Sequence, residues 1–172
     1  MKKKKIMWFH GMGGEHEPEL REFLKKYNLD FFNPSMDYEL NKNNEKFNRY
    51  ILDIADDYEY IAGNSMGGFW AFHVGSMLGK KTILFNPAIS DITLSYKWFY
   101  NNFYKWNMEI AEPLRKKTNV KIFLSTHDDV VDTERTLSWL KENNFKHEVE
   151  WMENHTHSLP LDLIIKNIFK SL

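Results

Sequence analysis

The chain has 172 residues, is 42% hydrophobic and 16% aromatic, and carries a formal net charge of −1. These values predict a single globular domain over residues 1–172, and they exclude a disordered chain as well as a charge-driven attraction to nucleic acid or to an anionic membrane. The sequence has no cysteine, which excludes disulfides and thiolate zinc sites, and no stretch as long and apolar as a membrane span, so we expect a cytoplasmic protein.

The first half of the chain alternates short apolar runs with stretches of helical spacing. In chain order, this half predicts a strand over 6–9, a helix over 18–27, a strand over 29–32, a helix from Phe47 to Ile54, a strand over 58–62 and a helix over 66–78. The last of these helices is followed by Gly79, which is the residue type expected at a helix C-terminus.

The second half continues the alternation after an irregular aromatic stretch. It predicts a strand over 82–85, a strand over 120–124, a helix over 133–140, a strand over 147–152 and a helix over 161–169. Residues 92–113 are crowded with aromatic side chains and are a candidate for a small cap segment. Alternating strands and helices predict an α/β fold: a mainly parallel sheet of about six strands with helices on both faces.

Chemically active residue types follow four of the predicted strands. In an open parallel sheet, sites form at the carboxyl ends of the strands, so these residues should share one edge. They are His10-Gly11-Met12, Asn64-Ser65-Met66, His127-Asp128-Asp129 and His155-Thr156-His157. Their chain order, serine then carboxylate then histidine, is the order of an α/β-hydrolase catalytic triad.

The run Gly63-Asn64-Ser65-Met66-Gly67 fits the G-x-S-x-G pattern of a nucleophile elbow. In such an elbow the serine sits on a sharp strand-to-helix turn, and the residues two before and two after it pass close together, so both favour glycine. The following helix points its positive N-terminal end at the reacting oxygen. We therefore predict Ser65 as a nucleophile, the alternative being a tight turn without chemistry.

The glycine-rich turn after the first strand completes the predicted site. The backbone N–H groups of Met12 and Met66 can point at one oxygen and form an oxyanion hole. The G-x-G-x-x-G motif of dinucleotide-binding proteins does not match from Gly11, because it requires glycine at the position of His16. A phosphate-binding P-loop is excluded as well, because that motif closes with Gly-Lys-Ser/Thr and the sequence does not contain this run.

The acid and the base have competitors. Asp128, just beyond the fifth strand, is the predicted acid, with Asp129 and Asp132 nearby. One of His155 and His157 is the predicted base, and the other lies at the rim. An H-x-H pair can also bind metal, but only Asp162 follows it as a further ligand, so we expect neither a metal nor another cofactor.

Five short motifs resemble those of a known family. WFHGMGG, GNSMGGFWA, LFNPA, STHDDVVD and HSL occur in the order seen in the small bacterial esterases of the YqiA/YcfP type, which are minimal members of the α/β-hydrolase superfamily. The resemblance covers almost the whole chain. It implies Ser65 as nucleophile, Asp128 as acid and His157 as base, and it implies hydrolysis of a carboxylic ester or a thioester without a cofactor.

The expected partner is therefore a small-molecule acyl ester or thioester. The aromatic stretch either lines an acyl pocket above the site, with Trp98, Phe99 and Trp106 as candidate contacts, or forms a helix packed into the core. Two other functions use the same fold. One is acyl transfer to an alcohol or amine instead of water, and the other is a binding protein that keeps the fold without turnover.

Overall fold

The computed structural model describes residues 3–12, 14, 18–36, 45–89 and 119–172. Its strands form one six-stranded sheet in the order β2-β1-β3-β4-β5-β6, and every neighbouring pair is parallel. This confirms the predicted sheet. The strands are β1 (Lys4–Phe9), β2 (Leu29–Phe32), β3 (Tyr60–Asn64), β4 (Lys81–Phe85), β5 (Val120–Ser125) and β6 (His147–Met152).

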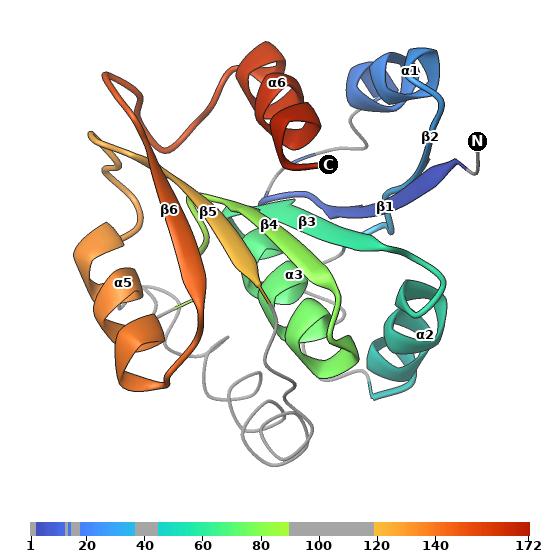
Figure 1. Ribbon diagram of the computed structural model, residues 1–172, viewed down its shortest axis with the longest axis horizontal. Helices are drawn as coiled ribbons and strands as arrows, with labels where there is room; N and C mark the ends of the chain where they lie inside the picture. Colours follow the sequence, from blue (N-terminus) through green and yellow to red (C-terminus); the bar gives the residue numbers. More distant parts are fainter. Residues whose placement is uncertain (1–2, 13, 15–17, 37–44, 90–118) are drawn as a thin grey trace.

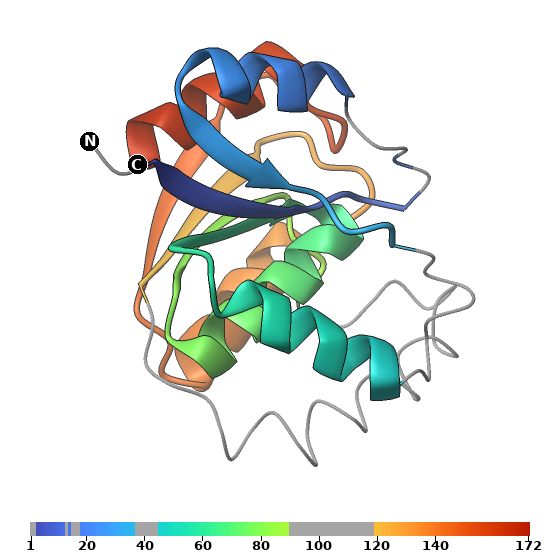
Figure 2. The same cartoon turned by 90° about the vertical axis from the view of Figure 1, so that its right-hand side faces the viewer.

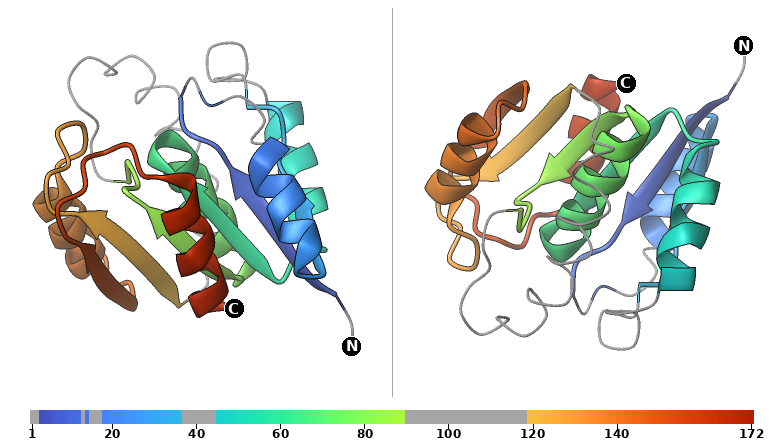
Figure 3. Two further views of the ribbon diagram at one scale, coloured as in Figure 1. Left: turned by 90° about the horizontal axis from the view of Figure 1, so that it is seen from above. Right: turned by 90° about the horizontal axis from the view of Figure 1, so that it is seen from below.

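Helices cover both faces of this sheet, as predicted. Figures 1 and 2 show α1 and α6 on one face and α2, α3 and α5 on the other, and Figure 3 shows each face in turn. Among the helices that the structure describes, none has the length and apolarity of a bilayer crossing. The helices are α1 (Pro18–Lys26), α2 (Glu45–Ala55), α3 (Ser65–Leu78), α5 (Thr133–Glu142) and α6 (Leu161–Ser171).

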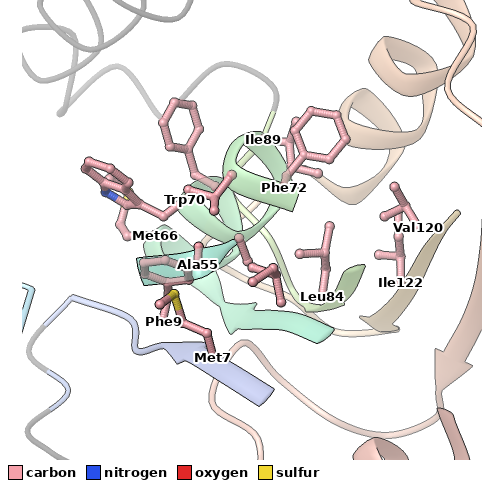
Figure 4. Close-up of a cluster of buried hydrophobic side chains, with 14 of the residues drawn as sticks. Met7, Phe9, Ala55, Met66, Trp70, Phe72, Leu84, Ile89, Val120 and Ile122 are labelled. Atoms are coloured by element: carbon pink, nitrogen blue, oxygen red, sulfur yellow. The ribbon is translucent and has the colours of Figure 1, made fainter. Parts of the chain in front are cut away.

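The two-sided cover explains why the central strands read as continuous apolar runs. Along β1, Ile6 and Trp8 point into the core under α1 and α6, whereas Met7 and Phe9 point into the core under α3. Because successive side chains of a strand alternate between faces, both faces must be apolar where both are covered. Figure 4 shows the α3 side of this core, with Met7 and Phe9 beneath the helix.

Helix α3 runs through the larger core and is buried over nearly its whole length. It begins directly at the end of β3, and it ends at Gly79, whose φ of 67° and ψ of 31° form the left-handed C-cap that the sequence predicts. Burial on most sides fixes this helix rigidly against the sheet. Its first residue, Ser65, is therefore held at a defined place at the sheet edge.

Two expectations for the strands need correction. The third strand begins two residues later than predicted, because the N–H of Tyr58 donates to the carbonyl of Ala55 and closes the turn after α2. The first strand begins at Lys4, two residues earlier than predicted, because it pairs with β2 from Lys4 onward. On β6, at the edge of the sheet, Val149 and Trp151 are 36% and 41% exposed. Residues 92–113, with Trp98, Phe99 and Trp106, lie outside the described residues.

Candidate active site

Ser65 occupies a strained turn between β3 and α3. Its φ of 50° lies in the left-handed region, which residues with a side chain rarely adopt. A Cβ added at Gly63 would overlap the carbonyl of Gly67, and one added at Gly67 would overlap the carbonyl oxygen of Phe9. The two glycines therefore have no room for a side chain, which is the backbone crowding expected of a nucleophile elbow.

A chain of short hydrogen bonds leads from Ser65 to a carboxylate. The Oγ of Ser65 lies 2.8 Å from Nε2 of His157, and Nδ1 of His157 lies 2.9 Å from both carboxylate oxygens of Asp128. Since a carboxylate can only accept, Nδ1 carries the proton and donates it to Asp128. In the neutral ring, Nε2 then accepts from the hydroxyl of Ser65. The ring is in the tautomer that a general base requires.

Asp128 is fixed by more than the histidine. Its Oδ1 also accepts hydrogen bonds from the backbone N–H groups of Val130 and Val131, each at 2.9 Å, and its side chain is only 1% exposed. Burial by itself would raise the pKa of Asp128, but the hydrogen bonds from His157, Val131 and Val130 and the nearby imidazole together lower the pKa below its usual value. The carboxylate therefore stays ionised beside His157.

The two segments that carry the predicted oxyanion residues lie next to Ser65. Met66 is the second residue of α3, so its N–H belongs to the first turn, where backbone donors have no acceptor within the helix. Gly11, which precedes Met12, packs against the elbow: a Cβ added at Gly11 would lie 3.3 Å from the Cβ of Ser65. The loop after β1 therefore packs against the elbow, next to the start of α3.

The other candidates for the acid and the base have different contacts in the structure. Asp132 caps α5, where its Oδ1 accepts from the N–H of Arg135 at 2.9 Å, and Asp129 is exposed. His155 is partly buried, and its backbone carbonyl accepts the N–H of His127 at 3.0 Å. In the described part of the chain, no three histidine or acidic side chains are grouped so that they could hold a metal ion.

His10 supports the loop that carries Met12, a role that the sequence reasoning missed. Its ring is buried, its Nε2 accepts the N–H of Met36 at 3.3 Å, and its Nδ1 lies 2.7 Å from the carbonyl oxygen of Gly11. Nδ1 must therefore carry the proton and donate to that carbonyl. The sequence signal for this role was a histidine directly after the apolar run Ile6–Phe9, because a buried polar side chain at the end of such a run needs hydrogen-bond partners.

Comparison with known proteins places the chain in a family. The family model described as "Uncharacterised protein family (UPF0227)" matches residues 24–160. The chain belongs to the UPF0227 family. It is 25% identical over 165 residues to a UPF0227 protein of Pasteurella multocida (strain Pm70), covering 88% of this chain and 89% of that protein. The match to a UPF0227 protein of Serratia proteamaculans (strain 568) is 29% identical over 106 residues and spans 59% of this chain and 57% of that protein.

Membership in UPF0227 confirms the resemblance of the motifs to the YqiA/YcfP-type family. The fold of this UPF0227 chain is also similar to solved structures. Esterase PE8 superposes with a TM-score of 0.65 at 16% identity, covering 99% of this chain and 93% of that one. An S-formylglutathione hydrolase from Agrobacterium tumefaciens superposes with a TM-score of 0.69 at 13% identity, covering 98% and 82%. At such low identity the likeness shows a shared fold, the α/β-hydrolase fold.

Proposed function

We propose that this UPF0227 protein is a serine hydrolase that cleaves carboxylic esters or acyl thioesters, with Ser65 as nucleophile, His157 as base and Asp128 as acid. The observation that carries the proposal is the continuous hydrogen-bonded chain from Ser65 through His157 to Asp128, which starts on a strained turn at a helix N-terminus. The solved structures with this fold include esterase PE8 and an S-formylglutathione hydrolase, which supports a hydrolase reaction for this chain.

The proposed reaction follows from the atoms that the site brings together. His157 takes the proton of Ser65 through Nε2 as Oγ attacks the acyl carbonyl, and the ionised Asp128 stabilises the imidazolium that forms. The backbone N–H groups of Met12 and Met66 hold the oxyanion. His157 then protonates the alcohol or thiol as it departs, and the acyl group remains bound to Ser65. Water, activated by the same histidine, releases the acid and restores the free serine.

None of these steps needs a metal or another cofactor, and we assign the whole site to a single α/β-hydrolase domain over residues 1–172. Acyl recognition is assigned, on the sequence alone, to the aromatic segment 92–113 with Trp98, Phe99 and Trp106. Aromatic side chains suit an acyl pocket because they offer a large apolar surface with little rotational freedom to lose. The partner is a small acyl ester or thioester, and the same acyl-enzyme would serve an alcohol or amine acceptor if one replaced water.

The test is a screen of the purified protein against chromogenic esters and acyl-thioesters of graded chain length. Ser65→Ala should lower kcat by about 10³-fold or more. Ser76→Ala is the matched control, because Ser76 lies on the same helix and its hydroxyl donates to the carbonyl of Phe72, one turn earlier in the helix. Wild-type turnover in the Ser65→Ala variant, or equal loss in both variants, would refute the proposal.

A further inference from the structure

The turn of Asn86, Pro87 and Ala88 follows β4 and touches both halves of the candidate site. The N–H of Ala88 donates to the carbonyl of Ser65 at 3.0 Å, so the turn holds the strained residue of the elbow directly. Pro87 lies against the next turn of α3, where a Cβ added at Gly68 would come within 2.6 Å of the Cβ of Pro87. The turn is therefore packed tightly onto the start of α3.

The side chain of Asn86 extends from this turn to the loop that carries His157. Its Nδ2 lies 2.9 Å from the carbonyl oxygen of His157, 3.3 Å from that of Thr156 and 2.8 Å from Oγ of Ser125. Its Oδ1 accepts the N–H of Ser125 at 2.8 Å, and its own N–H donates to the carbonyl of Phe123 at 2.9 Å. Only 1% of the residue is exposed. Asn86 thus joins the end of β5 to the histidine loop.

We propose that Asn86 is a positioning residue, which holds the backbone of His157 at hydrogen-bonding distance from Ser65. The role rests on the proposed function, because it matters for turnover only if His157 is the base. The amide does not touch the reacting atoms. It acts through the main chain, since the two carbonyls it binds belong to His157 and to the residue before it. Catalytic groups must be held to within about 0.5 Å, and a displacement of about 1 Å can cost about 10²-fold in rate.

The local conformation accounts for asparagine at this position. The φ of Asn86 is 41°, in the left-handed region that asparagine tolerates better than other residues with a side chain. The site also needs donors toward two carbonyl oxygens and an acceptor toward the N–H of Ser125, and a primary amide supplies both. An aspartate would keep the acceptor but turn an oxygen toward the carbonyls. A glycine would fit the backbone but remove the side chain.

These two alternatives define the test. Asn86→Asp and Asn86→Gly should each lower kcat by about 10²-fold with KM nearly unchanged, and each should slow labelling of Ser65 by a fluorophosphonate. Asn86→Gly relieves the positive φ, so this variant keeps the fold even if the buried carboxylate of Asn86→Asp prevents folding. The matched control is Asn167→Asp, which also places a carboxylate at a buried asparagine but lies on the second half of α6. Asn167→Asp should keep the wild-type kcat.

A readout without substrate separates this proposal from the proposed function. The proton shared between Nδ1 of His157 and Asp128 should give a low-field resonance in the wild-type NMR spectrum, and the resonance should broaden or shift in both Asn86 variants but not in Asn167→Asp. If the wild type shows neither hydrolysis nor labelling, the proposed function fails, and the resonance still decides the role of Asn86. Folded Asn86 variants with wild-type kcat and resonance would overturn the proposal. Loss of cooperative unfolding in both variants would also overturn it, because Asn86 would then be required for folding.

Discussion

Replacing Asp128 by asparagine should remove most of the activity while leaving the fold intact. The structure predicts how the new amide would lie. Oδ1 of Asp128 accepts two backbone N–H groups, those of Val130 and Val131, and only an oxygen can accept them. The NH₂ group of asparagine must therefore take the place of Oδ2 and face His157.

This orientation forces the wrong tautomer on His157. Nδ1 lies 2.9 Å from both carboxylate oxygens of Asp128, so in the variant it faces the NH₂ group, which can only donate, beside an Oδ1 that already accepts two backbone N–H groups. A proton on Nδ1 would then point at the hydrogens of the NH₂ group, so Nδ1 accepts from the amide instead of donating. The ring proton would then move to Nε2, and Nε2 could no longer take the proton of Ser65. In a Ser-His-Asp triad this change costs about 10⁴-fold in kcat, which corresponds to about 5 kcal/mol in the activation barrier.

The assay is hydrolysis of the best chromogenic ester found in the screen, with two matched controls. Asp129→Asn makes the same chemical change at an exposed neighbour and should keep wild-type kcat. Asp132→Asn should keep kcat and stability, because asparagine caps a helix about as well as aspartate does. The reasoning is refuted if Asp128→Asn retains kcat within about tenfold of wild type, or if either control loses as much.

Three further predictions concern the base, the elbow and the acid. His157→Ala should nearly abolish turnover, whereas His155→Ala should alter mainly KM; the reverse ranking, with both variants folded by circular dichroism, would show that the base is misassigned. Gly67→Ala should lower the free energy of unfolding by about 1–3 kcal/mol or more in urea titrations, because its Cβ would overlap the carbonyl oxygen of Phe9, and unchanged stability would contradict the elbow geometry. Burial raises the pKa of Asp128, but its hydrogen bonds lower the pKa by more, so the ionised form stabilises the fold. This contribution is complete above a pH of about 3.9 and is lost as the pH falls through the lowered pKa of the folded state. In acid, the free energy of unfolding should therefore fall more steeply in wild type than in Asp128→Asn.

Much of the fold could be predicted because its elements are locally encoded. The apolar run that forms β2 is bounded by Asn33-Pro34, and Gly79 ends α3, so these boundaries are visible in the sequence. The start of β3 was wrong by two residues, because the hydrogen bond from Tyr58 to Ala55 that closes the preceding turn is not a composition signal. The exposure of Val149 and Trp151 on β6 depends on strand order, which pattern does not define.

The candidate site was predictable where spacing carries the chemistry. Gly63 and Gly67 flank Ser65 at the distances that an elbow requires, and the structure shows that neither glycine has room for a side chain. Asn86 could be read only as the end of a strand, because its partners Ser125 and His157 lie 39 and 71 residues away along the chain. Contacts between residues so far apart in the sequence come from the packing of strands and loops, and a single sequence contains no local signal for them.

The most direct test of the central claim is covalent labelling of the purified protein with a fluorophosphonate, followed by mass spectrometry of its peptides. This reagent reacts with a serine only when a base removes the hydroxyl proton and an oxyanion hole receives the phosphonyl oxygen. The account predicts one adduct, on the peptide that contains Ser65, and no adduct in Ser65→Ala. A folded wild-type protein that remains unlabelled, or an adduct on another serine, would contradict it.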